Sequence, residues 1–193
     1  MSEVAVGDDG IARCWWAAGD PLYRAYHDDE WGRAIRDDRG LFERISLEAF
    51  QSGLSWLVIL RKRPGFRAAF ADFDIATVAE FDDADRKRLL ADAGIVRNRA
   101  KIDATIANAN ATLDLHASGT SLTDLLWSFA PPARSAPTSF DDVPAITDES
   151  TAMAKGLKRH GFRFVGPTTC YALMQAVGMV NDHLADCAAR TAV

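Results

Sequence analysis

Apolar residues recur along this chain at the spacing of a helix, and no stretch of useful length alternates apolar and polar residues as a strand does. One apolar stripe covers residues 41–49 and ends at Gly53. A second covers 102–113 in steps of 4, 3 and 4 residues, which predicts a long amphipathic helix. The pattern therefore predicts an all-α fold.

Further helices are predicted from apolar runs and from residues that begin or end helices. The segment 54–73 continues after Gly53 with a bend at Pro64-Gly65, and Asp82 is placed as the N-cap of a helix that stops near Gly94. Shorter helices are expected at 122–129, 148–160 and 167–177. Residues 130–148 are rich in Pro and Ser, so we expect an ordered loop or a connector between two lobes there.

Composition limits the class of protein. A length of 193 residues suits one domain, or one domain with a small lobe, and the contents of 48% hydrophobic and 25% charged residues are ordinary for a globular protein. The N-terminal stretch is acidic and lacks an apolar core, so we expect residues 1–11 to be a disordered extension and not a signal peptide. No apolar run is long enough to span a membrane, and three cysteines favour a reducing, cytoplasmic setting without disulfides.

The net charge of −5 argues against a nucleic-acid partner only if the charges are evenly spread. Basic residues cluster at 61–63, 97–101 and 155–160, while acidic residues gather at 28–30, 82–85 and 141–142. An acidic protein can still present one basic face to DNA. The alternative is that each cluster is a solvated helix end.

Soft metal ligands stand near both ends of the chain, namely Cys14 and His27 at the start and His183 and Cys187 at the finish. The second pair is spaced i, i+4 and would share one face of a helix. Two thiolates and two imidazoles complete the tetrahedron of a closed structural Zn²⁺ site. Alternatively these residues are buried core positions, because 12 residues separate the first pair and this is no compact finger spacing. Cys170, in an apolar run, is predicted to be a core residue.

A glycine-rich turn, GFRFVGPTT at 161–169, joins the last two predicted helices. Gly166-Pro167 opens the second of them, with proline at a first-turn position. The free backbone amides at such a helix start suit a phosphate. Glycine between two helices is also commonplace, so the turn alone does not define a binding site.

Several uncommon motifs occur in order and together resemble the DNA-3-methyladenine glycosylase I family. They are DPLYRAYHDDEWG at 20–32, LEAFQSGLSW at 47–56, GFRFVGPT at 161–168 and NDH at 181–183. The resemblance covers about residues 12–187. It implies a helix-hairpin-helix DNA glycosylase fold with a second helical lobe, as one two-lobed domain over 12–188 followed by a tail at 189–193. It also implies one structural Zn²⁺ on Cys14, His27, His183 and Cys187.

The activity implied is that of a monofunctional glycosylase in base excision repair. It would hydrolyse the N-glycosidic bond of 3-methyladenine in double-stranded alkylated DNA after flipping the cationic base out of the stack. The free base would be the product, and we expect a monomer with no membrane partner. Methylation at N3 already makes the base a good leaving group, so its protonation is not required.

The resemblance also assigns roles at particular positions. Glu48 would read the base, and Trp16, Tyr26 and Trp56 would form aromatic walls that attract a cation. Backbone amides of the hairpin would bind DNA phosphate, and a two-residue wedge would fill the gap left by the flipped nucleotide. These DNA-contacting positions are Gly53, Leu54, Arg163, Val165, Gly166, Thr168 and Thr169.

Each role has a plainer alternative. Trp56 could be core, Tyr26 could pack only against the metal ligands, Glu48 could lie solvated on a helix surface, and Gly53-Leu54 could be a simple turn. Asp182 is expected to support a ligand or cap a helix. Trp15 beside Trp16 leaves open which indole faces the pocket. Rival functions are a lesion-binding module without turnover and a zinc hydrolase, although four protein ligands leave a hydrolase no open coordination position.

Overall fold

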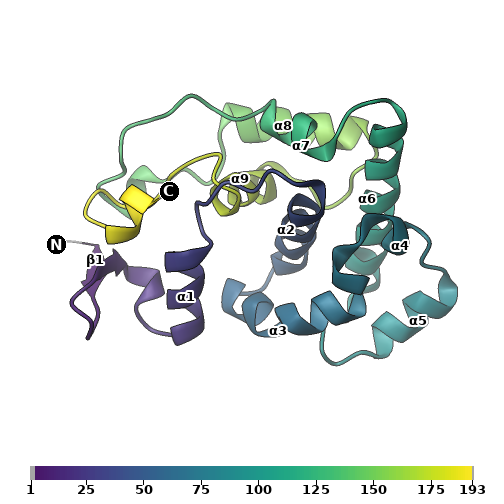
Figure 1. Ribbon diagram of the computed structural model, residues 1–193, viewed down its shortest axis with the longest axis horizontal. Helices are drawn as coiled ribbons and strands as arrows, with labels where there is room; N and C mark the ends of the chain where they lie inside the picture. Colours follow the sequence, from purple (N-terminus) through teal and green to yellow (C-terminus); the bar gives the residue numbers. More distant parts are fainter. Residues whose placement is uncertain (1–2, 193) are drawn as a thin grey trace.

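Helices dominate the computed structural model, which describes residues 3–192 (Figure 1). The longer helices are α1 (Pro21–Asp29), α2 (Asp38–Gln51), α3 (Trp56–Ala69), α5 (Asp83–Ala91), α6 (Arg99–Ala117), α8 (Asp148–Arg159) and α9 (Pro167–Ala176). Two short ones are α4 (Ile75–Ala79) and α7 (Leu122–Trp127), and 3₁₀ turns cover Trp15–Ala17, Ala71–Phe73, Phe140–Asp142 and Ala188–Ala192. The predicted helical architecture is thus confirmed, with one small addition at the N-terminus.

That addition is a two-stranded antiparallel sheet, in which β1 (Val4–Val6) pairs with β2 (Ala12–Cys14). The disorder expected for residues 1–11 is therefore wrong from Val4 onward, while Met1 and Ser2 lie outside the described residues. The physical reason is Arg13, which is buried and donates to the carboxylates of Asp9 and Asp28. The strands are too short for alternation to reveal them.

Side-chain caps begin most of the helices. The Asp82 carboxylate accepts from the backbone N–H groups of Ala84 and Asp85. The Asp85 carboxylate in turn accepts from the backbone N–H of Asp82, so the predicted N-cap is a full capping box. The segment 54–73 was expected to be one helix, but α3 ends at Ala69. Residues 71–73 all have positive φ, and this turn lets the buried rings of Phe70 and Phe73 stack 5.7 Å apart.

Helix α2 is central and packs against α3, α6, α7 and α9 (Figure 1). The main apolar core surrounds it and includes Phe42 and Phe50 from its inward face. A second apolar cluster lies where the two ends of the chain meet, and contains Tyr26, Trp31 and Leu184. Trp56 packs against both clusters, so the boundary between them lies at the start of α3.

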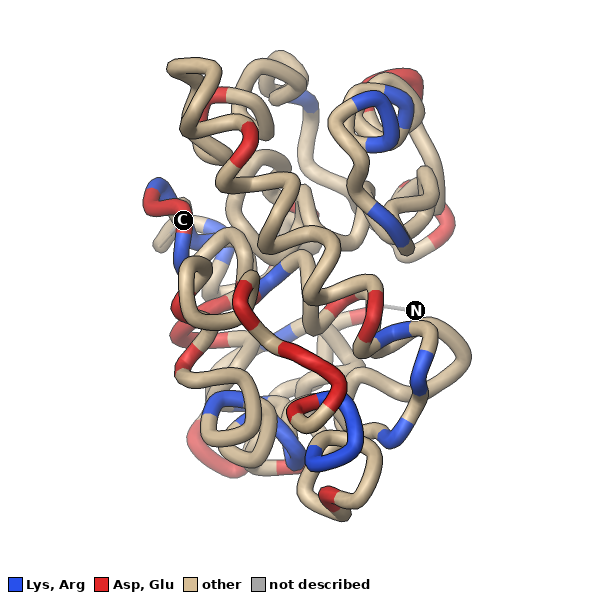
Figure 2. Tube along the Cα trace, turned by 90° about the vertical axis from the view of Figure 1, so that its right-hand side faces the viewer, with Lys and Arg blue, Asp and Glu red and all other residues tan. Residues whose placement is uncertain are grey.

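Basic residues from two of the three predicted clusters bind partners within the fold. Lys101 is buried and its Nζ donates to the carbonyls of Phe50 (2.9 Å) and Ser52 (2.6 Å), which stabilises the C-terminal end of α2. Arg61 pairs with Asp20, and Arg63 with Glu30. Figure 2 accordingly shows blue and red segments close together in the lower half of the trace. No helix in the described part of the chain is long and apolar enough to span a membrane.

Candidate functional site

A cavity of about 290 Å³ opens at the boundary between the two apolar clusters. Side chains of α1, α2, α3 and α9, of the N-terminal 3₁₀ turn and of the 140–143 loop line it: Trp16, Tyr23, Tyr26, Trp31, Glu48, Gln51, Trp56, Phe140, Val143, Ala172 and Gln175. The structure therefore brings the predicted Trp16, Tyr26, Glu48 and Trp56 to one cavity from four separate elements.

The walls of this cavity are aromatic rings in fixed contact. Tyr26 and Trp56 lie 5.4 Å apart between ring centres, and Trp16 meets Trp31 edge-on at 5.1 Å. Trp16 faces the cavity, whereas Trp15 is 59% exposed outside it, which resolves the choice between the two indoles. The indole N–H of Trp56 is buried without an acceptor among the described residues. The cavity thus offers π faces to a flat ligand.

Glu48 supplies the acidic group of the cavity. It is 5% exposed, and within the described part of the chain no donor makes a hydrogen bond to its carboxylate. Burial raises the pKa of Glu48 to about 8, and the nearby Arg44 guanidinium opposes that rise. The side chain is therefore neutral at pH 7 in the free protein and ready to ionise beside a cation.

Gln175 of α9 is a polar wall residue that the sequence patterns did not reveal. Its Nε2 donates to Asp182 Oδ2 (2.8 Å), which also accepts from the Tyr171 hydroxyl (2.7 Å), while Arg134 binds Asp182 Oδ1. A carboxylate only accepts, so the Gln175 amide oxygen must face away from Asp182. Asp182 therefore supports a wall of the cavity and caps no helix.

Four buried ligands meet beside the cavity: Cys14, His27, His183 and Cys187, whose ligand atoms all lie within 4.8 Å of one another. His27 Nε2 is 3.2 Å from His183 Nδ1, and Cys187 Sγ is 3.4 and 3.5 Å from these two nitrogens. Tetrahedral bonds of about 2.0 Å to nitrogen and about 2.3 Å to sulfur would separate such atoms by about 3.3 to 3.6 Å. The group therefore has the dimensions of a metal site.

The two imidazoles are held as metal-binding histidines usually are. His27 Nδ1 lies 2.8 Å from Asp28 Oδ1, and His183 Nε2 lies 3.1 Å from the Trp31 carbonyl, so each ring turns its other nitrogen to the cluster. The mutual hydrogen bond of the two thiols raises the pKa of Cys14 and lowers that of Cys187.

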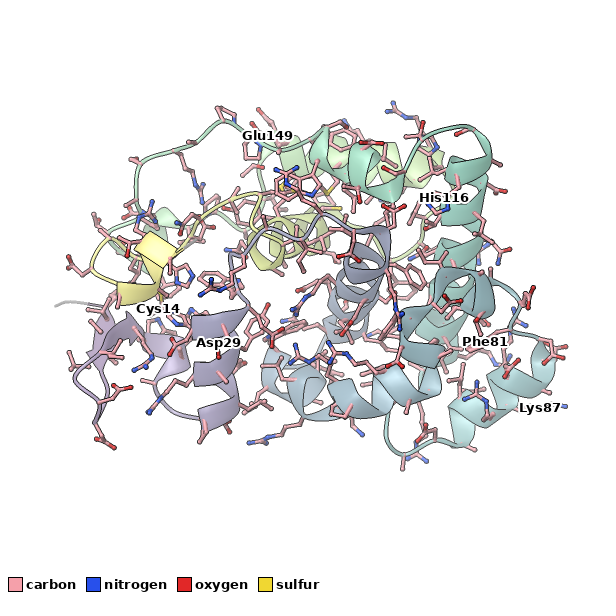
Figure 3. The ribbon with its side chains drawn as sticks, viewed as in Figure 1. Cys14, Asp29, Phe81, Lys87, His116 and Glu149 are labelled. Atoms are coloured by element: carbon pink, nitrogen blue, oxygen red, sulfur yellow. The ribbon has the colours of Figure 1, made fainter. Side chains whose placement is uncertain are left out.

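The prediction that His183 and Cys187 share one face of a helix is wrong. His183 and Cys187 do not lie on a helix, but on a turn between α9 and the last 3₁₀ segment. Arg190 donates to the carbonyls of Asn181 and His183, and these bonds hold the turn. Figure 3 shows Cys14 beside this C-terminal segment. The rings of Trp16 and Trp31 contact His27 and His183, so the cluster also positions two walls of the cavity.

The turn between α8 and α9 exposes backbone donors. Gly166 begins α9 without a side-chain cap, and the N–H groups of Thr168 and Thr169 donate to no described residue. Val165 is buried and anchors the turn, while Arg163 is exposed next to it. This arrangement matches the predicted anion-binding helix start.

Asn108 of α6 fixes the conformation of that turn, and nothing in the sequence pattern pointed to it. Its side chain is 1% exposed, accepts from Arg163 N (2.7 Å) and donates to Arg163 O (3.2 Å). The next residue, Phe164, is held at a φ of 55° with its ring 40% exposed. A buried amide thus positions the strained tip of the turn.

The predicted wedge lies on the turn between α2 and α3. Gly53 has a φ of 81°, a conformation that glycine adopts without strain, and Leu54 is 42% exposed. Lys101 fixes the preceding carbonyl of Ser52, so the turn is anchored from α6. An apolar side chain is therefore presented to solvent on a well-supported loop.

Comparison with known proteins gives consistent matches over nearly the whole chain. The model of the methyladenine glycosylase family matches residues 16–191. The chain is 48% identical over 179 residues to DNA-3-methyladenine glycosylase 1 of Escherichia coli K12, covering 92% of this chain and 96% of that protein.

Solved structures agree with the sequence matches. A crystal structure of a 3-methyladenine DNA glycosylase I superposes with a TM-score of 0.89 at 48% identity, over 91% of this chain and 98% of the other. A Staphylococcus aureus 3-methyladenine DNA glycosylase I, from a study of 3-methyladenine recognition, superposes with a TM-score of 0.88 at 34% identity, over 92% and 96% of the two chains.

The raised pKa of Glu48 predicts how stability depends on pH. Between its ordinary value of 4.5 and its value of about 8 in the fold, Glu48 keeps a proton that the unfolded chain has released. The free energy of unfolding therefore falls as pH rises through this window, by up to about 1.4 kcal/mol per pH unit from this group. The Glu48→Gln variant lacks this loss, so its stability relative to the wild-type protein should increase with pH.

Denaturant unfolding of both proteins between about pH 5 and pH 8 measures this difference. Glu43→Gln is the matched control, because Glu43 lies on the same helix and pairs with Arg67 on the surface. A Glu48→Gln difference that stayed constant across this range would contradict the prediction.

Proposed function

Because the chain belongs to the methyladenine glycosylase family, we propose that it hydrolyses the N-glycosidic bond of 3-methyladenine in double-stranded alkylated DNA, as a base excision repair enzyme. The observation that carries the proposal is Glu48, a buried and unpaired carboxylate in a cavity walled by aromatic rings. Such a cavity attracts a flat cation, and 3-methyladenine in DNA is one.

Recognition proceeds from the chemistry of the walls. The flipped base stacks against Trp16 or Trp56, with Tyr26 shaping the cavity, and its exocyclic amine donates to Glu48. Approach of the positive ring favours the ionised form of Glu48, so capture of the base releases the carboxyl proton. A neutral adenine provides no such driving force, and the cavity therefore selects for charge.

Hydrolysis needs little help once the base is held. The electron pair of the broken C1′–N bond moves onto the base and neutralises its ring, water supplies the new oxygen on C1′, and a proton is released to solvent. The ring is positive before cleavage and neutral after it, so Glu48 contributes mainly to capturing the base.

The DNA is held through the turn between α8 and α9, which acts as the hairpin of a helix-hairpin-helix unit. Amides at Val165, Gly166, Thr168 and Thr169 bind a backbone phosphate, and Arg163 adds attraction that is independent of sequence. The exposed Leu54, on its glycine turn, enters the space that the flipped nucleotide leaves.

The four-ligand cluster holds one structural zinc ion. A bound metal would cross-link the two ends of the chain. It would not take part in catalysis, since four protein ligands leave no open coordination position. The zinc proposal is supported by the spacing of the ligand atoms. It is also supported by the acceptors that bind the second ring nitrogen of each histidine, Asp28 for His27 and the Trp31 carbonyl for His183. This arrangement also disfavours a zinc hydrolase.

Excision by the Glu48→Gln variant tests the central proposal. Glutamine keeps the size and an acceptor oxygen but removes the charge, and loss of one charge-assisted hydrogen bond should lower the second-order rate constant by about 10- to 100-fold. Release of 3-methyladenine from methylated duplex DNA measures it, with Glu43→Gln as control. Binding of the lesion by the wild-type protein without any base release would favour the rival lesion-binding module, and equal rates for the two variants would remove Glu48 from recognition.

Metal analysis tests the zinc proposal. The purified protein should contain one zinc ion per chain, and Cys187→Ala should lose it and melt at a lower temperature, because metal binding contributes to folding free energy. Cys170→Ala is the control, since Cys170 is equally buried but lies outside the cluster. Full metal content in the Cys187→Ala protein would reject the site.

Salt dependence tests the DNA contact. Arg163→Ala should weaken binding to all duplex sequences alike and reduce the slope of log affinity against log salt by about one. Arg88→Ala is the control, because Arg88 lies on α5, at a distance from α9 in Figure 1, and pairs with Asp85. An unchanged slope for Arg163→Ala, or a loss limited to one sequence, would contradict the contact.

A further inference from the structure

A partly buried group of charges joins α1, α2 and α3 next to Tyr26, a wall of the cavity. Arg44 stands one helical turn before Glu48 on α2 and is 6% exposed. Its Nη2 donates to Glu30, which also binds Arg63 of α3 through both carboxylate oxygens, at 2.6 and 2.7 Å. The guanidinium carbon of Arg44 lies 5.5 Å from the ring centre of Tyr26, a wall of the cavity.

The charges of this group do not balance by themselves. Two guanidinium ions share the single carboxylate of Glu30, which leaves one positive charge. The Arg44 Nη1 atom is buried and donates to no described residue, and Glu48 likewise accepts from none. Glu48 lies one helical turn away on the same face of α2. The Arg44 charge acts on it, since it opposes the rise in the pKa of Glu48.

Other charged or titratable groups around Glu48 are either neutral or already paired. Tyr26 is buried and its pKa is raised by that burial, with opposing influences of Arg44 and Glu48. Behind Gln175, Asp182 is bound to Arg134 and Tyr171. Besides Glu48, the polar groups that line the cavity include Tyr23 and Tyr26 from α1 and Gln175 from α9. The charged groups of the neighbouring cluster are Glu30 at the C-cap of α1, Arg44 of α2 and Arg63 of α3.

We propose that Arg44 is a positioning residue that favours ionisation of Glu48 as the cationic base arrives, and that Glu30 and Arg63 fix Arg44 in that place. Glu30 also offsets part of the Arg44 charge, so that Arg44 favours the carboxylate without strongly repelling the base. The inference rests on the proposed role of Glu48 and adds the source of its charge. Removing the positive charge of Arg44 should make Glu48 harder to ionise. Removing the negative charge of Glu30 should make it easier to ionise.

The test is the pH dependence of the second-order rate constant for 3-methyladenine excision, which reports ionisation in the free enzyme. The methylated base carries a fixed charge in DNA. The fall of the rate constant at low pH, called here the acidic limb of the profile, therefore reports a group of the protein. Arg44→Met should move that limb to higher pH by about one unit, and Glu30→Gln should move it to lower pH. Arg44→Lys, which keeps the charge, should lie close to the wild-type profile.

The matched control is Arg67→Met, because Arg67 forms an exposed Arg–Glu pair with Glu43 between the same two helices, α2 and α3. Its limb should not move. A merely structural role of Arg44 would lower the rate at every pH and leave the limb in place, and this result would overturn the inference. If Arg44→Met does not fold, the direction of the Glu30→Gln shift decides, and a shift to higher pH or no shift rejects the proposal.

Failure of this inference differs from failure of the proposed function. If Glu48→Gln loses excision and its acidic limb while the Arg44 and Glu30 variants leave the limb unmoved, only the role of Arg44 is rejected. If the wild-type limb persists unchanged in Glu48→Gln, the role of Glu48 itself is rejected.

Discussion

Helix α2 carries a carboxylate, Glu48, into a cavity of aromatic rings, and an unpaired carboxylate there costs free energy unless a cation joins it. The surroundings are arranged around this constraint. The apolar face of α2 anchors the main core through Phe42 and Phe50, so the helix cannot turn Glu48 toward water. Lys101 secures the end of the same helix. The rigidity of the core thus keeps Glu48 in a place where it must either hold its proton or meet a cation.

The second constraint is that the walls of the cavity come from distant parts of the chain. Trp16 and Trp31 near the N-terminus rest against His27 and His183, and the second of these comes from the C-terminal segment. Any cross-link among the four ligands therefore sets the positions of two aromatic walls. The proposed metal site and the proposed base site are separate in chemistry but linked in geometry, as is usual where outer contacts orient a site.

The sequence was informative where the signal is local. The capping residue Asp82, the helix start at Gly166-Pro167 and a glutamate among apolar neighbours, Glu48, each carry their physical reason within a few residues. Asn108 and Gln175 carried no such signal. Their importance comes from partners 55 and 7 residues away, Arg163 and Asp182, and only the folded chain brings these together.

Local patterns also misled where tertiary contacts decide the conformation. The i, i+4 spacing of His183 and Cys187 is satisfied by a turn that Arg190 holds, and a helix is not needed to bring the ligands together. The strand Val4–Val6 forms because Arg13 ties its hairpin to Asp28 of α1. In both places the hydrogen bonds of one arginine, Arg190 to carbonyls and Arg13 to carboxylates, outweigh the weak preference of a short segment.

The distribution of charge over the protein surface also depends on tertiary contacts. The chain has a net charge of −5, and several of its acidic residues pair with arginines, such as Asp20 with Arg61 and Glu30 with Arg63. The basic residues of the α8–α9 region, Lys155, Lys158, Arg159 and Arg163, are exposed and have no ion-pair partner among the described residues. In the proposed complex, DNA would meet this short basic surface beside amides that are free to donate. Because few cations would contribute, attraction to the phosphates would be modest, and selectivity would depend on the charge of the base within the cavity.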